Sequence, residues 1–147
     1  MRIEREIHLP APPETVYDLI VDPRRLGDWV TIHRGLRRVP AGPLEAGSEL
    51  VQTLAIASVP IEIAWTVITA RRPREVVWDG HGPARSRARI EYRLAPVGSG
   101  TRFAYINEFE LPGGPFGRIA AAAMSTTRLA DREMDQSLAR LRRLLER

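Results

Sequence analysis

The chain has no cysteine and no long apolar segment. The lack of cysteine excludes disulfide bonds, thiolate metal sites and a cysteine nucleophile, and it agrees with a reducing compartment, so we expect the cytoplasm. No apolar run approaches the roughly 18 residues that a membrane span needs. No charged segment is followed by an apolar one at the start of the chain, so we expect no secretion signal either.

Lysine is absent as well, and all 22 basic residues are arginine beside 18 acidic ones, for a net charge of +4. Such a charge suits a nucleic-acid or acidic-membrane partner. Arginine used alone in an alanine- and proline-rich background is explained more simply by a GC-rich genome. The arginines at positions 85, 87, 89 and 93 share one face of a segment, but no aromatic residue lies between them for base stacking. We interpret this row as a solvated sheet face and expect no nucleic-acid partner.

The familiar catalytic and cofactor motifs are missing too. The sequence has no G-x-S-x-G, no G-x-x-x-x-G-K and no G-x-G-x-x-G. His8 and His81 have no histidine or carboxylate partner at metal-ligand spacing, so no metal site is expected. We likewise expect no cofactor.

The 147 residues predict one domain spanning residues 1–147. Residues 115–146 follow a Pro-Gly-Gly-Pro cluster and repeat apolar side chains at three- and four-residue steps, which predicts one long helix. The first half of its apolar face is small and soft, whereas the second half is a row of leucines. A sheet packed on the leucines would leave space opposite the alanines, so we expect a cavity there.

Alternating apolar and polar residues predict seven strands. They cover residues 2–9, 34–38, 49–57, 61–70, 76–78, 85–94 and 101–111. Gly80 and Gly82 are expected to end the fifth strand early. Two short helices lie after the first strand, one led by Pro12 and Pro13 and one that Asp22 caps before it runs to about Trp29. This order predicts an α+β fold in which a curved antiparallel sheet surrounds the long C-terminal helix.

This order of elements, with "APPETVYDLIVDPRRLGDW" after the first strand and "GSGTRF" between the last two, resembles the START-like (Bet v 1-like, SRPBCC) superfamily and its polyketide cyclase/dehydrase branch. The resemblance covers nearly the whole chain. It implies a helix-grip fold with an internal cavity for a hydrophobic or aromatic small molecule. The stretches "DWVTIH", "IAWTVI" and "DGHGPARS" also resemble small bacterial START-like proteins, some of them labelled toxins of toxin–antitoxin pairs.

Several polar residues fall on inward faces or near the expected mouth of the cavity. His33 is a candidate acid, base or ligand-orienting group, although a histidine in a surface loop is the simpler explanation. Asn107 lies on the inward face of the last strand and is the best candidate for a polar ligand contact. Gln52 needs a partner in the fold or in a ligand. Arg5 is expected to reach the rim or to pair with a carboxylate.

Aromatic residues on the sheet are candidates for lining the cavity, although plain core residues would give the same pattern. We expect Trp29, His33 and Trp78 to form the rim beside the loop at residues 80–83, with Ala123 beneath it. The expected ligand contacts are Trp29, His33, Trp65, Trp78, Tyr92, Tyr105, Asn107, Phe116, Ala120, Ala123, Met124 and Thr127.

Three functions remain open. The leading hypothesis is the binding or carriage of a hydrophobic or aromatic small molecule without catalysis, because no acid, base and nucleophile converge. The second is a polyketide aromatase/cyclase-like enzyme, in which His33 and Asn107 are the candidate catalytic residues. The third is the toxin component of a toxin–antitoxin pair. The sequence does not fix the ligand or the oligomeric state.

Overall fold

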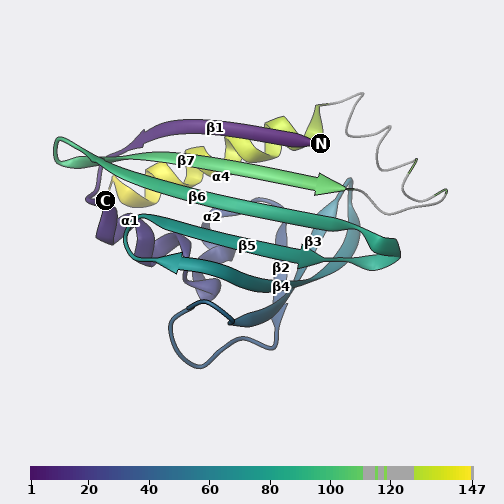
Figure 1. Cartoon of the computed structure of the whole chain (residues 1–147). Coiled ribbons are helices and arrows are strands. Elements are labelled where there is room, and N and C mark those ends of the chain that lie inside the picture. Colours follow the sequence, from purple (N-terminus) through teal and green to yellow (C-terminus); the bar gives the residue numbers. More distant parts are fainter. Residues whose placement is uncertain (111–114, 116–117, 119–127, 147) are drawn as a thin grey trace.

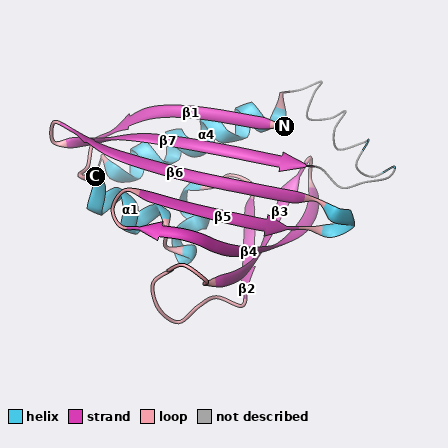
Figure 2. Cartoon of the chain, in the orientation of Figure 1, coloured by secondary structure: helices cyan, strands magenta, loops and turns pink. Residues whose placement is uncertain are grey.

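A computed structural model describes residues 1–110, 115, 118 and 128–146. Seven antiparallel strands form a single sheet in the order β1-β7-β6-β5-β4-β3-β2, which confirms the predicted antiparallel sheet. The sheet curves, and the helices lie against one of its faces (Figures 1 and 2). The elements in chain order are β1 (Arg2–Leu9), α1 (Pro13–Ile20), η1 (Pro23–Arg25), α2 (Leu26–Trp29), β2 (His33–Arg37), β3 (Glu49–Ile56), β4 (Val59–Arg71), β5 (Glu75–His81), η2 (Pro83–Arg85), β6 (Arg87–Val97), β7 (Gly100–Glu110) and α4 (Leu129–Leu145).

The strands form because apolar residues alternate with polar ones, so that one face of the sheet is buried and the other meets solvent. On β4, Ile61, Ile63, Trp65 and Val67 are all less than a tenth exposed, while the residues between them are more open. The turn between β6 and β7 is as predicted, since Val97 pairs with Gly100 across it.

The two short helices also agree with the prediction. Pro13 occupies the first turn of α1, where proline loses no helical hydrogen bond. Asp22 caps the next segment, and its carboxylate accepts a hydrogen bond from the backbone N–H of Arg24 at 3.0 Å. This second segment is a 3₁₀ turn followed by the single turn α2.

The C-terminal helix corrects one prediction. The helix α4 begins at Leu129, because Arg128 has φ 51° and ψ 39°, and a residue in this left-handed conformation cannot continue an α-helix. One uninterrupted helix over residues 115–146 is therefore wrong. The predicted row of leucines is buried, with Leu138 at 4% and Leu141 at 0% exposure. The small-residue half lies outside the described residues.

Strand β5 corrects another prediction, because it continues through Gly80 to His81. The glycine serves close packing here: a Cβ at Gly80 would lie 2.7 Å from the Trp65 ring and 2.7 Å from Ile63. The bare backbone lets the indole of Trp65 lie across the neighbouring strand. A glycine within an alternating strand can therefore mark a ring lying over it rather than the end of the strand.

A candidate ligand-binding cavity

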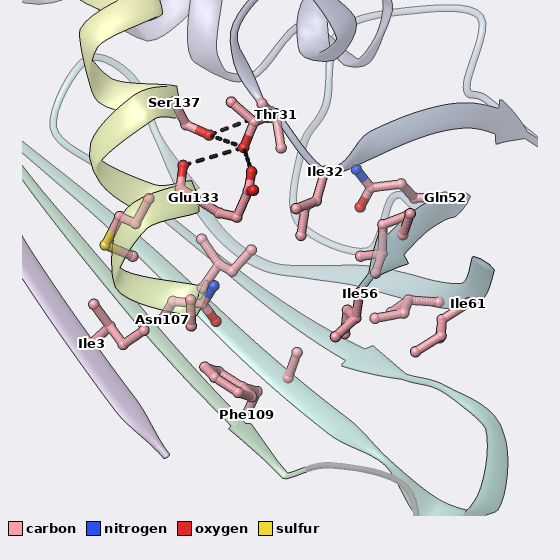
Figure 3. Close-up of a pocket in the computed structure, with 18 of the residues that line it drawn as sticks. Ile3, Thr31, Ile32, Gln52, Ile56, Ile61, Asn107, Phe109, Glu133 and Ser137 are labelled. Carbon is pink, nitrogen blue, oxygen red and sulfur yellow. Dashed lines mark hydrogen bonds between the residues drawn. The ribbon is translucent and has the colours of Figure 1, made fainter. Parts of the chain in front are cut away.

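A cavity of about 450 Å³ lies between the sheet, α4 and the segment that joins α2 to β2 (Figure 3). This volume is within the range of small-molecule sites. Its wall is mainly apolar, with Ile3, Ile32, Ile56, Ile61 and Phe109 among the residues seen in the close-up. Charged side chains that also line it include Arg34, Arg87, Glu110, Glu133 and Arg140.

The sheet contributes a row of residues that face the cavity from successive strands. Asn107 on β7 pairs with Ile3 on one side and Ile90 on the other, and Ile90 pairs in turn with Trp78 on β5. Residues paired across antiparallel strands point to the same side of a sheet. The register therefore places one amide and one indole on the same wall, with an isoleucine between them.

The aromatic residues of this wall contact one another edge to face. The ring centroids of Trp65 and Trp78 are 6.2 Å apart, those of Trp78 and Tyr92 are 6.2 Å apart, and those of Tyr92 and Tyr105 are 5.1 Å apart. Such tilted and T-shaped pairs are the arrangements that aromatic quadrupoles favour. These contacts restrict the movement of each ring, so the aromatic wall of the cavity is rigid.

The two tyrosines of the wall are neutral hydroxyl groups at physiological pH. Burial raises the pKa of Tyr105 to about 12, although hydrogen bonds with Tyr92 and Asn107 partly oppose this shift. Burial likewise raises the pKa of Tyr92 well above its ordinary value. Neither phenol is suited to act as a base, and both can position a ligand by hydrogen bonding.

A chain of hydrogen bonds leads from the aromatic wall to His33. The Trp65 indole donates to Gln52 Oε1 at 2.9 Å, which fixes the orientation of the amide. Gln52 Nε2 must then donate to His33 Nδ1, also at 2.9 Å. His33 is held neutral with its proton on Nε2, in agreement with its pKa, which burial and then the nearby Arg34 lower from 6.5.

The segment between α2 and β2 is fastened to α4 by Thr31 (Figure 3). The backbone N–H of Thr31 donates to Ser137 Oγ at 3.0 Å, and the two hydroxyl groups lie 3.1 Å apart. The backbone carbonyl and the carboxylate of Glu133 both lie within hydrogen-bond distance of the Thr31 hydroxyl, which can donate its one proton to either. These contacts close one side of the cavity against the helix.

Two polar atoms of cavity-lining residues are buried without a hydrogen-bond partner among the described residues. They are Trp78 Nε1 and Asn107 Oδ1. Trp29 Nε1 is buried without a partner too, but Trp29 does not line the cavity. Because buried polar groups usually have partners, the two unpartnered atoms on the wall suggest where a ligand would bond.

The predicted site residues divide into three groups. Trp65, Trp78, Tyr92, Tyr105 and Asn107 line the cavity. Trp29 and His33 do not line it, and the rim assigned to Trp29 and Trp78 is wrong, because these side chains are only 0% and 3% exposed. Trp29 packs instead against Tyr92 and Tyr105 in the core. The predicted contacts Phe116, Ala120, Ala123, Met124 and Thr127 lie outside the described residues.

Thr31, Glu133 and Ser137 line the cavity but were not among the predicted site residues. Ser137 is 6% exposed and lies on the same helix face as Met134 and Leu141. Its spacing of three and four residues from these apolar neighbours marked it as a buried hydroxyl in need of a partner. Thr31 had no comparable signal, because only the fold brings it to α4.

Several arginines outside the cavity are paired with carboxylates. Arg5 contacts Asp131 at 2.8 Å and Asp135 at 2.7 Å, which confirms that it pairs with carboxylates. On the solvated sheet face, Arg89 contacts Asp79 and Glu91, and Arg93 contacts Glu91. This interleaving of charges weakens the positive field that a phosphate backbone would need.

Across residues 1–110 and 128–146, no group of three or more histidine, aspartate or glutamate side chains is placed to hold a metal ion. None of the described helices is long and apolar enough to cross a membrane.

Known proteins are similar to this chain in sequence or in fold. A Mycobacterium tuberculosis protein named Toxin Rv0910 is 26% identical over 125 residues, which are 84% of this chain and 87% of that protein. The fold is similar to the Zhui aromatase/cyclase from Streptomyces sp. R1128, with a TM-score of 0.79, 13% identity and coverage of 100% and 94% of the two chains. It is also similar to a START superfamily protein from Mycobacterium smegmatis, with a TM-score of 0.73, 16% identity and coverage of 99% and 97%.

At identities of 13% and 16%, the two solved structures show that the chain has the helix-grip fold but say nothing about its function. The family assignment comes from the sequence, since one family model matches almost every residue. Matched over residues 1–146, the chain belongs to the family described as polyketide cyclase/dehydrase and lipid transport.

Proposed function

We propose that the protein binds or carries a hydrophobic or aromatic small molecule in the cavity between the sheet and α4. The observation that supports this proposal is a cavity of about 450 Å³ whose wall combines aliphatic side chains with a braced set of aromatic rings. Burying an apolar ligand there gains roughly 25 cal/mol per Å² of apolar surface. In our proposal Trp65, Trp78, Tyr92, Tyr105 and Asn107 contact the ligand.

A displacement assay tests this proposal without knowing the natural ligand. The neutral dye N-phenyl-1-naphthylamine should fluoresce on entering the cavity, and apolar or aromatic compounds of suitable size should displace it. Native mass spectrometry after mild extraction would then look for a co-purified molecule. If the dye and all competitors fail to bind the folded protein, the proposal is wrong.

A second candidate function, aromatase/cyclase-like catalysis, is favoured by the polar groups of the aromatic wall. Tyr105 keeps its proton because its pKa is about 12, so its hydroxyl group could donate a hydrogen bond to a carbonyl group of a reactive chain. The candidate catalytic residues are His33 and Asn107, although His33 does not line the cavity. Turnover of a polyketide-like substrate that is unchanged in both His33→Ala and Asn107→Ala would remove these residues from the mechanism.

The third candidate function, a toxin, rests on the name of the Mycobacterium tuberculosis relative rather than on a site in this chain. Its test is growth arrest on expression that a co-encoded neighbouring protein relieves. Normal growth at high expression would argue against it.

A further inference from the structure

We propose that Trp78 and Asn107 form a two-point polar subsite on the cavity wall. The subsite would select neutral ligands that carry a hydrogen-bond acceptor for the indole and a hydrogen-bond donor for the amide carbonyl. This inference rests on the proposed function and makes it more specific, because it names the chemistry of the ligand rather than its hydrophobicity alone.

The two indoles of the wall differ in one respect that carries the inference. Trp65 and Trp78 are both 3% exposed, both line the cavity and contact each other edge to face. The Trp65 N–H is satisfied by Gln52 Oε1 at 2.9 Å, whereas the Trp78 N–H has no partner among the described residues. A buried N–H left unbonded costs free energy, so the Trp78 indole is the one that a ligand would satisfy.

The amide of Asn107 supports the second point. Its carbonyl oxygen Oδ1 is buried and has no hydrogen-bond partner among the described residues. Asn107 also lines the cavity, on the same face of β7 as Tyr105. Figure 3 shows the Asn107 side chain among the apolar residues of the cavity. An acceptor fixed in this position calls for a donor on the ligand.

The register sets how far apart the backbones of the two residues are. Asn107 and Trp78 pair with the same residue, Ile90, from opposite sides, so their strands are two spacings apart. Two strand spacings are about 10 Å. The polar groups of the ligand should therefore lie at opposite ends of a rigid apolar framework, with its middle over Ile90.

The surroundings of the subsite favour a neutral ligand. In register, Asn107 and Trp78 are flanked by Ile3, Ile90 and Val67, none of which offers a counter-charge. A carboxylate or ammonium group placed there would be desolvated without compensation. At these two points we therefore expect hydroxyl groups on a ring system of at least two rings, because the charged side chains that line the cavity, such as Arg34 and Arg140, are not paired with Asn107 or Trp78.

A ligand series on the wild-type protein tests the subsite. The dissociation constants of naphthalene and 2,6-dihydroxynaphthalene are measured by displacement of N-phenyl-1-naphthylamine. At roughly fivefold per net hydrogen bond, the diol is expected to bind roughly 25-fold more tightly. The acceptor-only compound 2,6-dimethoxynaphthalene should lose the contribution of Asn107 and fall between the two.

Variants then assign the preference to its residues. Asn107→Leu and Trp78→Phe should each reduce the diol-to-naphthalene ratio about fivefold. Trp29→Phe is the matched control: it removes an indole whose N–H is also buried and unpartnered among the described residues but which does not line the cavity, so the ratio should not fall. Because each ratio is taken within one variant, a change in stability or cavity size affects both ligands.

The outcomes separate this inference from the proposed function. Equal binding of naphthalene and the diol to the wild type, or a ratio that both Asn107→Leu and Trp78→Phe leave unchanged, overturns the subsite while the cavity proposal stands. If no compound of the series displaces the dye and the dye itself binds, the subsite is also wrong. If the dye does not bind to the folded protein either, both the polar subsite and the proposed binding of a small molecule in the cavity are wrong.

Discussion

At the scale of single residues, the glycine at position 80 shows how close packing shapes the aromatic wall. Its missing side chain leaves room for the Trp65 ring, which in turn donates to Gln52. The chain of hydrogen bonds from Trp65 through Gln52 to His33 therefore depends on the space that Gly80 leaves for the Trp65 ring.

Gly80→Ala should destabilise the protein by about 1–3 kcal/mol, as is typical when an extra carbon is forced into a packed site. The added Cβ would lie 2.7 Å from both the Trp65 ring and Ile63, so one of these side chains must move. Gly35→Ala is the matched control on β2, because a Cβ there meets nothing within 4 Å. Urea unfolding of both variants measures the difference, and equal stabilities would contradict the packing argument.

The stability of the protein should fall as the pH decreases through about 6.5, because folding holds His33 in its neutral form. Burial and Arg34 lower the pKa of His33 in the folded state, so the unfolded state binds more protons between that lowered pKa and 6.5. The loss should level off once the pH is below the folded-state pKa. Above 6.5 the contribution of His33 is fully present.

The free energy of unfolding measured between about pH 5 and pH 8 checks this sign. His33→Gln keeps a side chain that can accept from Gln52 but removes the titrating ring, so its curve should be flatter. A wild-type stability that rises on acidification through this range would show that His33 prefers its charged form in the fold.

At the scale of elements, local patterns predicted the strands well and the C-terminal helix only in part. Alternation in β4 and β6 depends on nearest neighbours, which the sequence displays directly. The left-handed Arg128 has no such signal, since its neighbours continue a helical pattern. Contacts between elements were harder to predict than the elements themselves. Trp29 ends α2 as expected, but only the fold shows that its ring packs against Tyr92 in the core rather than at the rim of the cavity.

The contact between the α2–β2 segment and α4 leads to a prediction about Ser137. Ser137→Ala should destabilise the protein by about 1–3 kcal/mol, because the backbone N–H of Thr31 loses its acceptor in a partly buried site. Amide hydrogen exchange at Thr31 should become faster along with this loss. Arg132→Ala changes an exposed position on the same helix and should alter neither quantity. Unchanged protection of the Thr31 amide in Ser137→Ala would mean that other contacts hold the segment in place.

At the scale of the whole molecule, a curved sheet and one helix do not fill the space between them, and the cavity is the result. The sequence predicted which sheet residues face this space, because inward positions on β5, β6 and β7 follow from alternation. It did not reveal which of these side chains satisfy one another. Gln52 and Asn107 look alike in the sequence, yet Gln52 is bonded on both sides and Asn107 keeps an unpartnered oxygen.

Filling the cavity should therefore cost less stability than filling the core. The predicted filling substitution, Ala123→Trp, lies outside the described residues, but Ala88 on β6 lines the cavity and offers an equivalent position. Ala88→Leu should change the free energy of unfolding by less than about 1 kcal/mol, whereas Ala11→Leu, in the core and away from the cavity, should cost about 1–3 kcal/mol.

The same pair of variants separates binding from stability. Ala88→Leu should weaken binding of N-phenyl-1-naphthylamine at least several-fold, because the added carbons occupy space that the dye needs. Ala11→Leu should bind the dye as the wild type does at temperatures where it is folded. An Ala88→Leu protein that is as destabilised as Ala11→Leu would show that side chains already fill this part of the cavity. Full dye affinity in a stable Ala88→Leu protein would instead place the ligand elsewhere in the molecule.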